Sequence, residues 1–153
     1  PLALLEDERW MREALEHAGF AATMGEVPVG AVVVDAGGEM IGFGSNSPVG
    51  QCDPTAHAEI EALQMAGQRT NNYRLNGCTI YTTLEPCVMC AGAIVNARIQ
   101  RLVFGARDLR FGGVRSKFQI ADSELLNHRV EVVEGVLAVE CQRLLQGFFE
   151  ERR

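Results

Sequence analysis

At 153 residues, the chain is long enough for one domain, residues 1–153, that buries roughly two-thirds of its unfolded surface. Its composition, with 47% hydrophobic and 22% charged residues, is that of an ordinary globular protein, and its net charge of −6 argues against a polyanionic partner for the chain as a whole. No apolar run approaches the ~20 residues of a membrane-spanning helix, and residues 1–10 lack a signal-peptide pattern. We therefore expect a cytoplasmic protein with no membrane partner.

Two helices and a hairpin are predicted in the first half of the chain. Residues 6–24 indicate a helix, because apolar side chains recur there at three- and four-residue spacing. Residues 29–34 are β-branched and apolar, and residues 40–45 follow after hairpin-turn residues at 35–38. A second helix is predicted over residues 53–66, with Asp at its cap and Pro in its first turn.

Strands and helices alternate in the second half. The predicted elements are strand 79–83, helix 86–96, strand 101–104, short helix 122–126, strand 130–133 and helix 138–150. This order favours an α/β domain with one mixed sheet covered by helices on both faces.

The chain has five cysteines, an odd number that argues against a disulfide framework. Metal ligation, redox chemistry and plain burial remain as roles. For Cys52, Cys78 and Cys141 we expect burial, because lone intracellular cysteines usually behave as small hydrophobic residues.

The other two cysteines belong to a pattern typical of a metal site. Cys87 and Cys90 lie three residues apart at the start of a predicted helix, so both sulfurs project from one face. The positive end of the helix dipole favours the thiolate, which is the form that binds metal. With His57 they make three ligands, and a catalytic zinc site keeps its fourth position for water.

Glu59 is the predicted proton carrier of this site. It stands two residues from His57, and residues at that spacing do not share a helix face. Glu59 is thus badly placed to bind the same ion but could reach the water from the side. Taken alone, His-x-Glu is typical of an exposed helix turn and Cys-x-x-Cys of a redox pair; together they favour zinc.

A basic segment stands out against the acidic chain. Residues 98–117 carry six basic residues and one acid, a net charge of +5, so the remainder carries −11. Such a stripe can bind phosphates on an acidic protein, because attraction falls off within a Debye length of ~8 Å. A solvated basic loop is the alternative. The basic residues are Arg98, Arg101, Arg107, Arg110, Arg115 and Lys117.

The two motifs match the H-x-E…P-C-x-x-C signature of the zinc nucleobase deaminases. Over nearly its whole length the chain also resembles the bacterial tRNA-specific adenosine deaminases, the TadA family. The segments that carry this resemblance are 26–32, 53–60, 72–75, 83–93, 103–108, 127–130 and 148–149. The chain departs from the pattern at residues 112–118 and at Arg153, where relatives often carry a further basic tail.

The resemblance implies a cytidine-deaminase-like three-layer fold with a five-stranded sheet, a homodimer, and conversion of adenosine to inosine at the wobble position of a tRNA anticodon loop. It further implies one zinc ion per chain. The implied site residues are the ligands His57, Cys87 and Cys90, the proton carrier Glu59, the base contact Asn46, the pocket-lining Val29 and Leu84, and Asp108, Phe149 and Arg152 near the anticodon nucleotides.

Three alternatives stay open. A deaminase of free guanine, cytosine or a nucleoside would use the same chemistry without the basic stripe. A non-catalytic RNA-binding module with structural zinc would need a fourth protein ligand and no Glu59. A Cys87–Cys90 redox pair would form a reversible disulfide.

Overall fold

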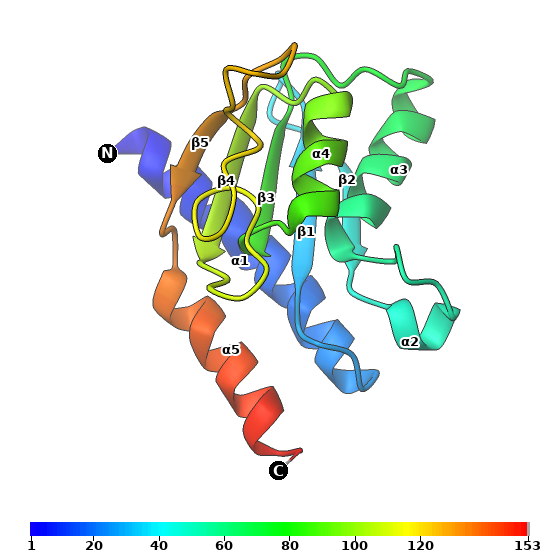
Figure 1. The fold of residues 1–153 in the computed structure, drawn as a ribbon, viewed down its shortest axis with the longest axis vertical. Helices are drawn as coiled ribbons and strands as arrows, with labels where there is room; N and C mark the ends of the chain where they lie inside the picture. Colours follow the sequence, from blue (N-terminus) through cyan, green and yellow to red (C-terminus); the bar gives the residue numbers. More distant parts are fainter. Residues whose placement is uncertain (153) are drawn as a thin grey trace.

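Five strands form one mixed sheet in the computed structural model, which describes residues 1–152 (Figure 1). In chain order the elements are α1 (Leu2–Thr23), β1 (Gly30–Val34), β2 (Met40–Ser45), α2 (Pro48–Gln51), α3 (Ala58–Thr70), β3 (Thr79–Leu84), α4 (Val88–Asn96), β4 (Arg101–Ala106), β5 (Glu131–Glu134) and α5 (Ala138–Glu150). The strand order is β2-β1-β3-β4-β5. β1 runs antiparallel to β2 and β3, whereas β3, β4 and β5 are parallel.

Helices cover both faces of this sheet, as predicted. Successive side chains of a strand point to opposite faces. Accordingly, Ala31 and Val33 of β1 pack in a core with α3 and α4, and Val32 and Val34 pack in a second core with α1 and α5. Figure 1 shows α1 crossing behind the sheet and α3 and α4 in front of it. The predicted three-layer α/β fold is confirmed.

Close contact between α3 and β2 fixes the start of α3. A Cβ atom on Gly44 would lie 2.2 Å from the carbonyl oxygen of Ala58, so only glycine lets the helix approach this strand. Ala58, Ala62 and Ala66 are fully buried along the same face of α3. The first turn of α3 is therefore held against the sheet by backbone-to-backbone packing.

α3 begins later than predicted. The predicted helix over residues 53–66 starts only at Ala58. The carboxylate of Asp53 accepts hydrogen bonds from the backbone N–H of Thr55, at 2.8 Å, and from its hydroxyl, at 2.7 Å. Asp53 thus closes a local turn instead of capping a helix, and His57 becomes the N-cap residue.

The short helix predicted over residues 122–126 is wrong: the segment forms turns. The carboxylate of Asp122 binds the guanidinium of Arg115 at 2.9 Å and leaves no helix cap. The hydroxyl of Ser123 accepts the backbone N–H of Leu125, which stabilises a local turn.

Two other helices differ from the prediction in extent. α1 begins at Leu2, four residues before the predicted start at residue 6. The four-residue α2 was not predicted, because it is too short to show a periodic apolar pattern. Within residues 1–152, no helix combines the length and the apolar character that crossing a membrane requires.

Candidate active site

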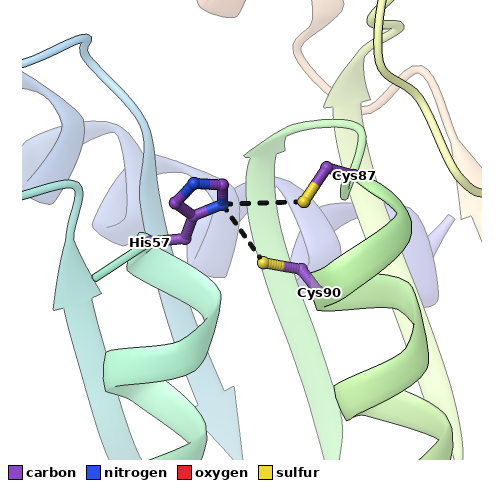
Figure 2. Close-up of side chains that lie close together, drawn as sticks. All are labelled: His57, Cys87 and Cys90. Atoms are coloured by element: carbon purple, nitrogen blue, oxygen red, sulfur yellow. Dashed lines mark hydrogen bonds between the residues drawn. The ribbon is translucent and has the colours of Figure 1, made fainter. Parts of the chain in front are cut away.

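α3 and α4 start side by side at one end of the sheet (Figure 2). α4 begins at Val88 rather than at the predicted residue 86, so Cys87 is its N-cap residue, as His57 is for α3. Both N-cap residues have extended backbone. Cys90 lies in the first turn of α4 and is fully buried. The predicted metal ligands are thus placed by two neighbouring helix starts.

The three ligand atoms have the spacing that zinc requires. Nδ1 of His57 lies 3.6 Å from Sγ of Cys87 and 3.4 Å from Sγ of Cys90 (Figure 2). Tetrahedral zinc with bonds of about 2.3 Å to sulfur and 2.0–2.1 Å to nitrogen separates such ligands by about 3.5 Å. All three atoms lie within 4.8 Å of one another, and in the described part of the chain no fourth His, Cys, Asp or Glu joins them. The group fits a three-ligand zinc site.

The protonation states of these three side chains also favour the binding of a cation. Hydrogen bonds from Cys90 and His57 lower the pKa of the Cys87 thiol to about 4, whereas the hydrogen bond to Cys87 and burial raise the pKa of Cys90. The Cys87 sulfur in turn raises the pKa of His57. One thiolate is thus ready for a metal, and coordination of a metal would remove the proton from the other thiol.

Glu59 is a buried carboxyl group beside this cluster. Its side chain lies in the first turn of α3 and is 4% exposed. Burial raises the pKa of Glu59 to about 7. A carboxyl group that titrates near neutrality accepts and releases protons readily, as a general acid/base must.

A cavity of about 820 Å³ opens above these residues. Eight predicted site residues line it, namely Val29, Asn46, His57, Glu59, Leu84, Cys87, Asp108 and Phe149. Cys90 lies beneath its floor, fully buried. Arg152 does not line it: its guanidinium stands 3.5 Å from the ring centroid of Phe148. The structure thus brings nine of the ten predicted residues together.

The comparisons with known proteins agree with this geometry. A family model described as MafB19-like deaminase matches residues 5–153. The tRNA-specific adenosine deaminase of Haemophilus influenzae is 53% identical over 147 residues, which are 96% of this chain and 85% of that protein. The chain belongs to the tRNA-specific adenosine deaminase family. The deaminase of the same name from Bacillus subtilis is 42% identical, over 98% of this chain and 92% of that protein.

Solved structures of deaminases also match this chain. One, from a study of A-to-I editing by tRNA:A34 deaminases at the wobble position, matches with a TM-score of 0.86 and 39% identity over 90% of this chain and 99% of that chain. A guanine deaminase from Nitrosomonas europaea matches with a TM-score of 0.81 and 27% identity, over 92% of this chain and 83% of that chain. The fold therefore serves more than one purine substrate among these relatives.

The mouth of the deaminase cavity is formed partly by the loop after β4. Leu109 and Phe111 are 71% and 64% exposed, and the guanidinium of Arg110 lies 5.7 Å from the Phe111 ring centroid. Oδ1 of Asp108 accepts the backbone N–H groups of Arg110 and Phe111, at 3.0 and 3.1 Å. Asp108 therefore lines the cavity and also holds the turn that presents its two neighbours.

The predicted basic stripe is divided in the structure. Arg101 stands at the start of β4 and Arg107 follows its end, so a six-residue strand, roughly 20 Å long, separates them. Arg101 pairs with Asp7 at 2.9 Å, and Arg107 pairs with Glu134 at 2.9 Å. Of the six basic residues, only Arg107 and Arg110 line the cavity.

The other cysteines follow the prediction in two cases out of three. Cys78 and Cys141 are buried, and burial raises the pKa of both thiols. The expected burial of Cys52 is wrong: Cys52 is exposed at the end of α2, where its backbone turns into the left-handed region at φ 51°. Packing by the four-residue α2 is too slight to cover it.

Sequence reasoning missed Glu85, which also lines the cavity but is only 2% exposed. Burial acts to raise its pKa, but hydrogen bonds from the hydroxyl of Ser116 and from the backbone N–H groups of Arg115, Ser116 and Asp108 outweigh burial and lower it. The only signal in the sequence was a charged residue between an apolar strand and the Cys motif.

A second hollow of about 880 Å³ lies between α3 and α4, away from the ligand group. Its lining consists of apolar and amide side chains with one phenol, that of Tyr73. Since it holds no acid or base that titrates near neutrality, we assign the chemistry to the cavity above Glu59.

Proposed function

We propose that the protein is a single-domain hydrolytic deaminase, residues 1–153, that converts adenosine to inosine at the wobble position of a tRNA anticodon loop. The observation that carries the proposal is the three-ligand group beside buried Glu59 at the floor of an open cavity. The relative that is 53% identical is named for this activity.

We propose one zinc ion per chain, held by His57, Cys87 and Cys90. When bound, zinc lowers the pKa of a coordinated water toward about 7 and so supplies hydroxide at neutral pH. The short distances from Nδ1 of His57 to both sulfurs support zinc over a redox pair, because a redox pair needs no third ligand. The redox alternative predicts a reversible disulfide and no stoichiometric metal.

Glu59 moves the protons of the reaction. Its carboxylate accepts a proton from the attacking water and gives it to the ring nitrogen next to C6 of adenine, which makes C6 electrophilic. The water oxygen forms a bond to C6. Glu59 then takes the second proton from this oxygen and delivers it to the exocyclic nitrogen as the C–N bond breaks, so ammonia leaves and C6 keeps a carbonyl oxygen. A pKa of about 7 lets one group perform both transfers at neutral pH.

The remaining cavity residues hold the base. Val29 and Leu84 supply apolar surface for an extruded purine, and the Asn46 side chain supplies hydrogen bonds to it. A base must leave its stack to reach such a cavity, and an anticodon loop makes this inexpensive because its bases are unpaired. Asp108, Phe149 and Arg152 are proposed to lie near the flanking nucleotides.

The residues at the cavity mouth, which we call the rim, favour RNA over a free base as substrate. Arg107 and Arg110 place guanidinium groups at the cavity mouth beside exposed Phe111, and such groups suit phosphates and unstacked bases. A free guanine or nucleoside needs neither. A structural-zinc module would need a fourth protein ligand, and residues 1–152 supply none.

The deciding experiment is a deamination assay with zinc-loaded protein. The substrates are an anticodon stem-loop with adenosine at the wobble position and, separately, free guanine, cytosine, adenosine and cytidine. We expect inosine in the stem-loop alone. Activity on a free base or nucleoside alone would keep the mechanism and overturn the substrate, and inactivity with zinc bound would revive the structural role.

Two further features are proposed on the family resemblance alone. We propose a homodimer, which molar mass in solution tests. We also propose a cytoplasmic location, where tRNA is available as substrate, and fractionation of cells that express the protein tests it.

A further inference from the structure

Glu85 connects the metal-ligand turn to the rim of the cavity. It stands between the end of β3 and Cys87, and its carboxylate accepts hydrogen bonds from the loop that follows β4. Oε1 accepts the backbone N–H of Asp108 at 3.0 Å and the hydroxyl of Ser116. Oε2 accepts the backbone N–H groups of Val114, Arg115 and Ser116 at 3.1, 2.7 and 2.9 Å.

The buried carboxylate of Glu85 is stable only while the loop supplies its hydrogen bonds. Removing an isolated carboxylate from water is very costly unless hydrogen bonds replace its hydration. Here five donors converge on Glu85, whereas the guanidinium of nearby Arg115 binds Asp122 at 2.9 Å. If the loop moved away, the carboxylate would lose all five partners at once, so the loop and Glu85 hold each other in place.

The loop backbone fits closely around this anchor. A Cβ on Gly112 would lie 2.4 Å from the Glu85 carboxylate, and one on Gly113 would lie 2.9 Å from the Cys87 backbone. Gly112 also pairs with Cys87 in an isolated β-bridge, and the N–H of Gly113 bonds to the Pro86 carbonyl at 2.8 Å. The loop is therefore seated directly on the turn that carries a metal ligand.

The same loop carries the exposed part of the rim. Leu109, Arg110 and Phe111 line the cavity mouth between Asp108 and Gly112, two residues that contact Glu85 or its turn. The position of these three side chains relative to the cavity floor therefore depends on the Glu85 anchor.

We propose that Glu85 is a positioning residue that fixes the rim loop, residues 108–116, on the metal-ligand turn and thereby sets the surface that recognises RNA next to the reacting base. The proposal rests on the proposed function for the RNA part and on the hydrogen bonds alone for the loop part. Glu85 does not touch the reacting atoms. It acts on substrate binding through the loop.

Asp7 provides a matched control. It is also a buried carboxylate, 4% exposed, and accepts bonds from Arg101 and Tyr81. It packs at the start of β4, at the opposite end of the strand from the loop. Asp7→Asn therefore removes a buried charge of similar burial without touching the rim.

The first measurement is hydrogen exchange of the zinc-loaded protein. In Glu85→Gln one carboxylate oxygen becomes an N–H₂ group that faces donors, so amides in residues 108–116 should exchange at least about tenfold faster. In Asp7→Asn the exchange of this segment should match the wild type. Unchanged exchange in Glu85→Gln, or equal acceleration in both variants, would overturn the proposal.

The second measurement separates binding from chemistry on the anticodon stem-loop. Glu85→Gln should raise KM by about tenfold or more and lower kcat much less, with zinc content per chain unchanged. An equal fall in kcat with unchanged KM, or loss of zinc, would overturn the positioning role. If Glu85→Gln does not fold, Gly112→Ala replaces it and should give the same KM rise. Unchanged KM in Gly112→Ala would also overturn the proposal.

Failure of the proposed function would look different. A wild-type protein that does not deaminate the stem-loop would refute the RNA substrate and, with it, the recognition part of this inference. The exchange measurement would still decide whether Glu85 fixes the loop, because it needs no substrate.

Discussion

The floor and the rim of the cavity are built by different means. The floor consists of side chains on the first turns of two helices that pack against the sheet, and there Glu59 is 4% and Cys90 0% exposed. The rim consists of a loop whose Leu109 and Phe111 are 71% and 64% exposed and which is held by hydrogen bonds to Glu85. The groups proposed for the chemistry are therefore fixed within the fold, whereas the surface proposed for substrate recognition is a loop that one buried carboxylate holds in place.

Loss of a metal ligand at the cavity floor should have the strongest consequence. Cys90→Ala deletes a fully buried side chain that we propose as a zinc ligand, so zinc content should fall from about one per chain to near zero and deamination should be lost. Metal analysis by mass spectrometry and the stem-loop assay check this. Cys78→Ala, which deletes a buried thiol outside the ligand group, should keep its zinc. A Cys90→Ala protein with full zinc would contradict the assignment.

The second prediction concerns proton transfer by Glu59, with the metal ligands left in place. Glu59→Gln preserves the shape but cannot carry a proton, so kcat should fall by about 10²- to 10⁴-fold while zinc stays bound. Single-turnover assays and metal analysis check both halves. Glu16→Gln on the exposed side of α1 should match the wild type. Loss of zinc from Glu59→Gln would make Glu59 a structural residue.

A smaller effect concerns the rim alone. Arg107→Glu reverses a charge at the cavity mouth and breaks the pair with Glu134. Stem-loop binding should weaken several-fold, and its dependence on the logarithm of salt concentration should fall by about 0.7 per lost phosphate contact. Fluorescence anisotropy at several salt concentrations checks this. Arg9→Glu on α1 carries the same charge change, and equal weakening in both would show a nonspecific effect.

The smallest effect tests how the far side of the rim loop is held. The Arg115 guanidinium keeps the pKa of Asp122 below its ordinary value of 3.8. A carboxylate that is more acidic when folded stabilises the protein fully above its unfolded pKa, and this contribution is lost as pH falls through the folded pKa.

Asp122→Asn should therefore cost about 0.5–1 kcal/mol at pH 7 and less below pH about 4. Urea unfolding at pH 7 and pH 3 measures the difference. Glu124→Gln, in a far more exposed pair with Arg129, should change stability less. A wild-type advantage that grows on acidification would refute the sign.

Local patterns made the sheet and the floor predictable. The run at residues 29–34 indicated a strand because β1 is buried on both faces, so no polar residue interrupts it. The ligands and Glu59 lie in two short motifs, each at a helix start, so their chemistry was visible within a few residues.

The features that could not be predicted depend on which hydrogen-bond partner a carboxylate finds in the folded chain. Asp122 resembles a helix cap in the sequence. In the structure its carboxylate binds Arg115 instead, and the segment forms turns rather than the predicted short helix. Asp53 misled for a local reason, because its carboxylate closes a turn with Thr55 two residues further on instead of capping a helix. The role of Glu85 rests on donors 23 to 31 residues further along, which no local pattern reveals.

Four of the five donors to Glu85 are backbone N–H groups, which every amino acid except proline provides. The side chains of residues 109–111 make no hydrogen bond to Glu85, so replacing them leaves all five donors to Glu85 in place. Grafting the corresponding residues of another deaminase should change which substrates are chosen while the catalytic machinery stays intact. Residues 109–111 are therefore the positions at which substrate preference can change, in evolution or by design, without loss of the Glu85 hydrogen bonds.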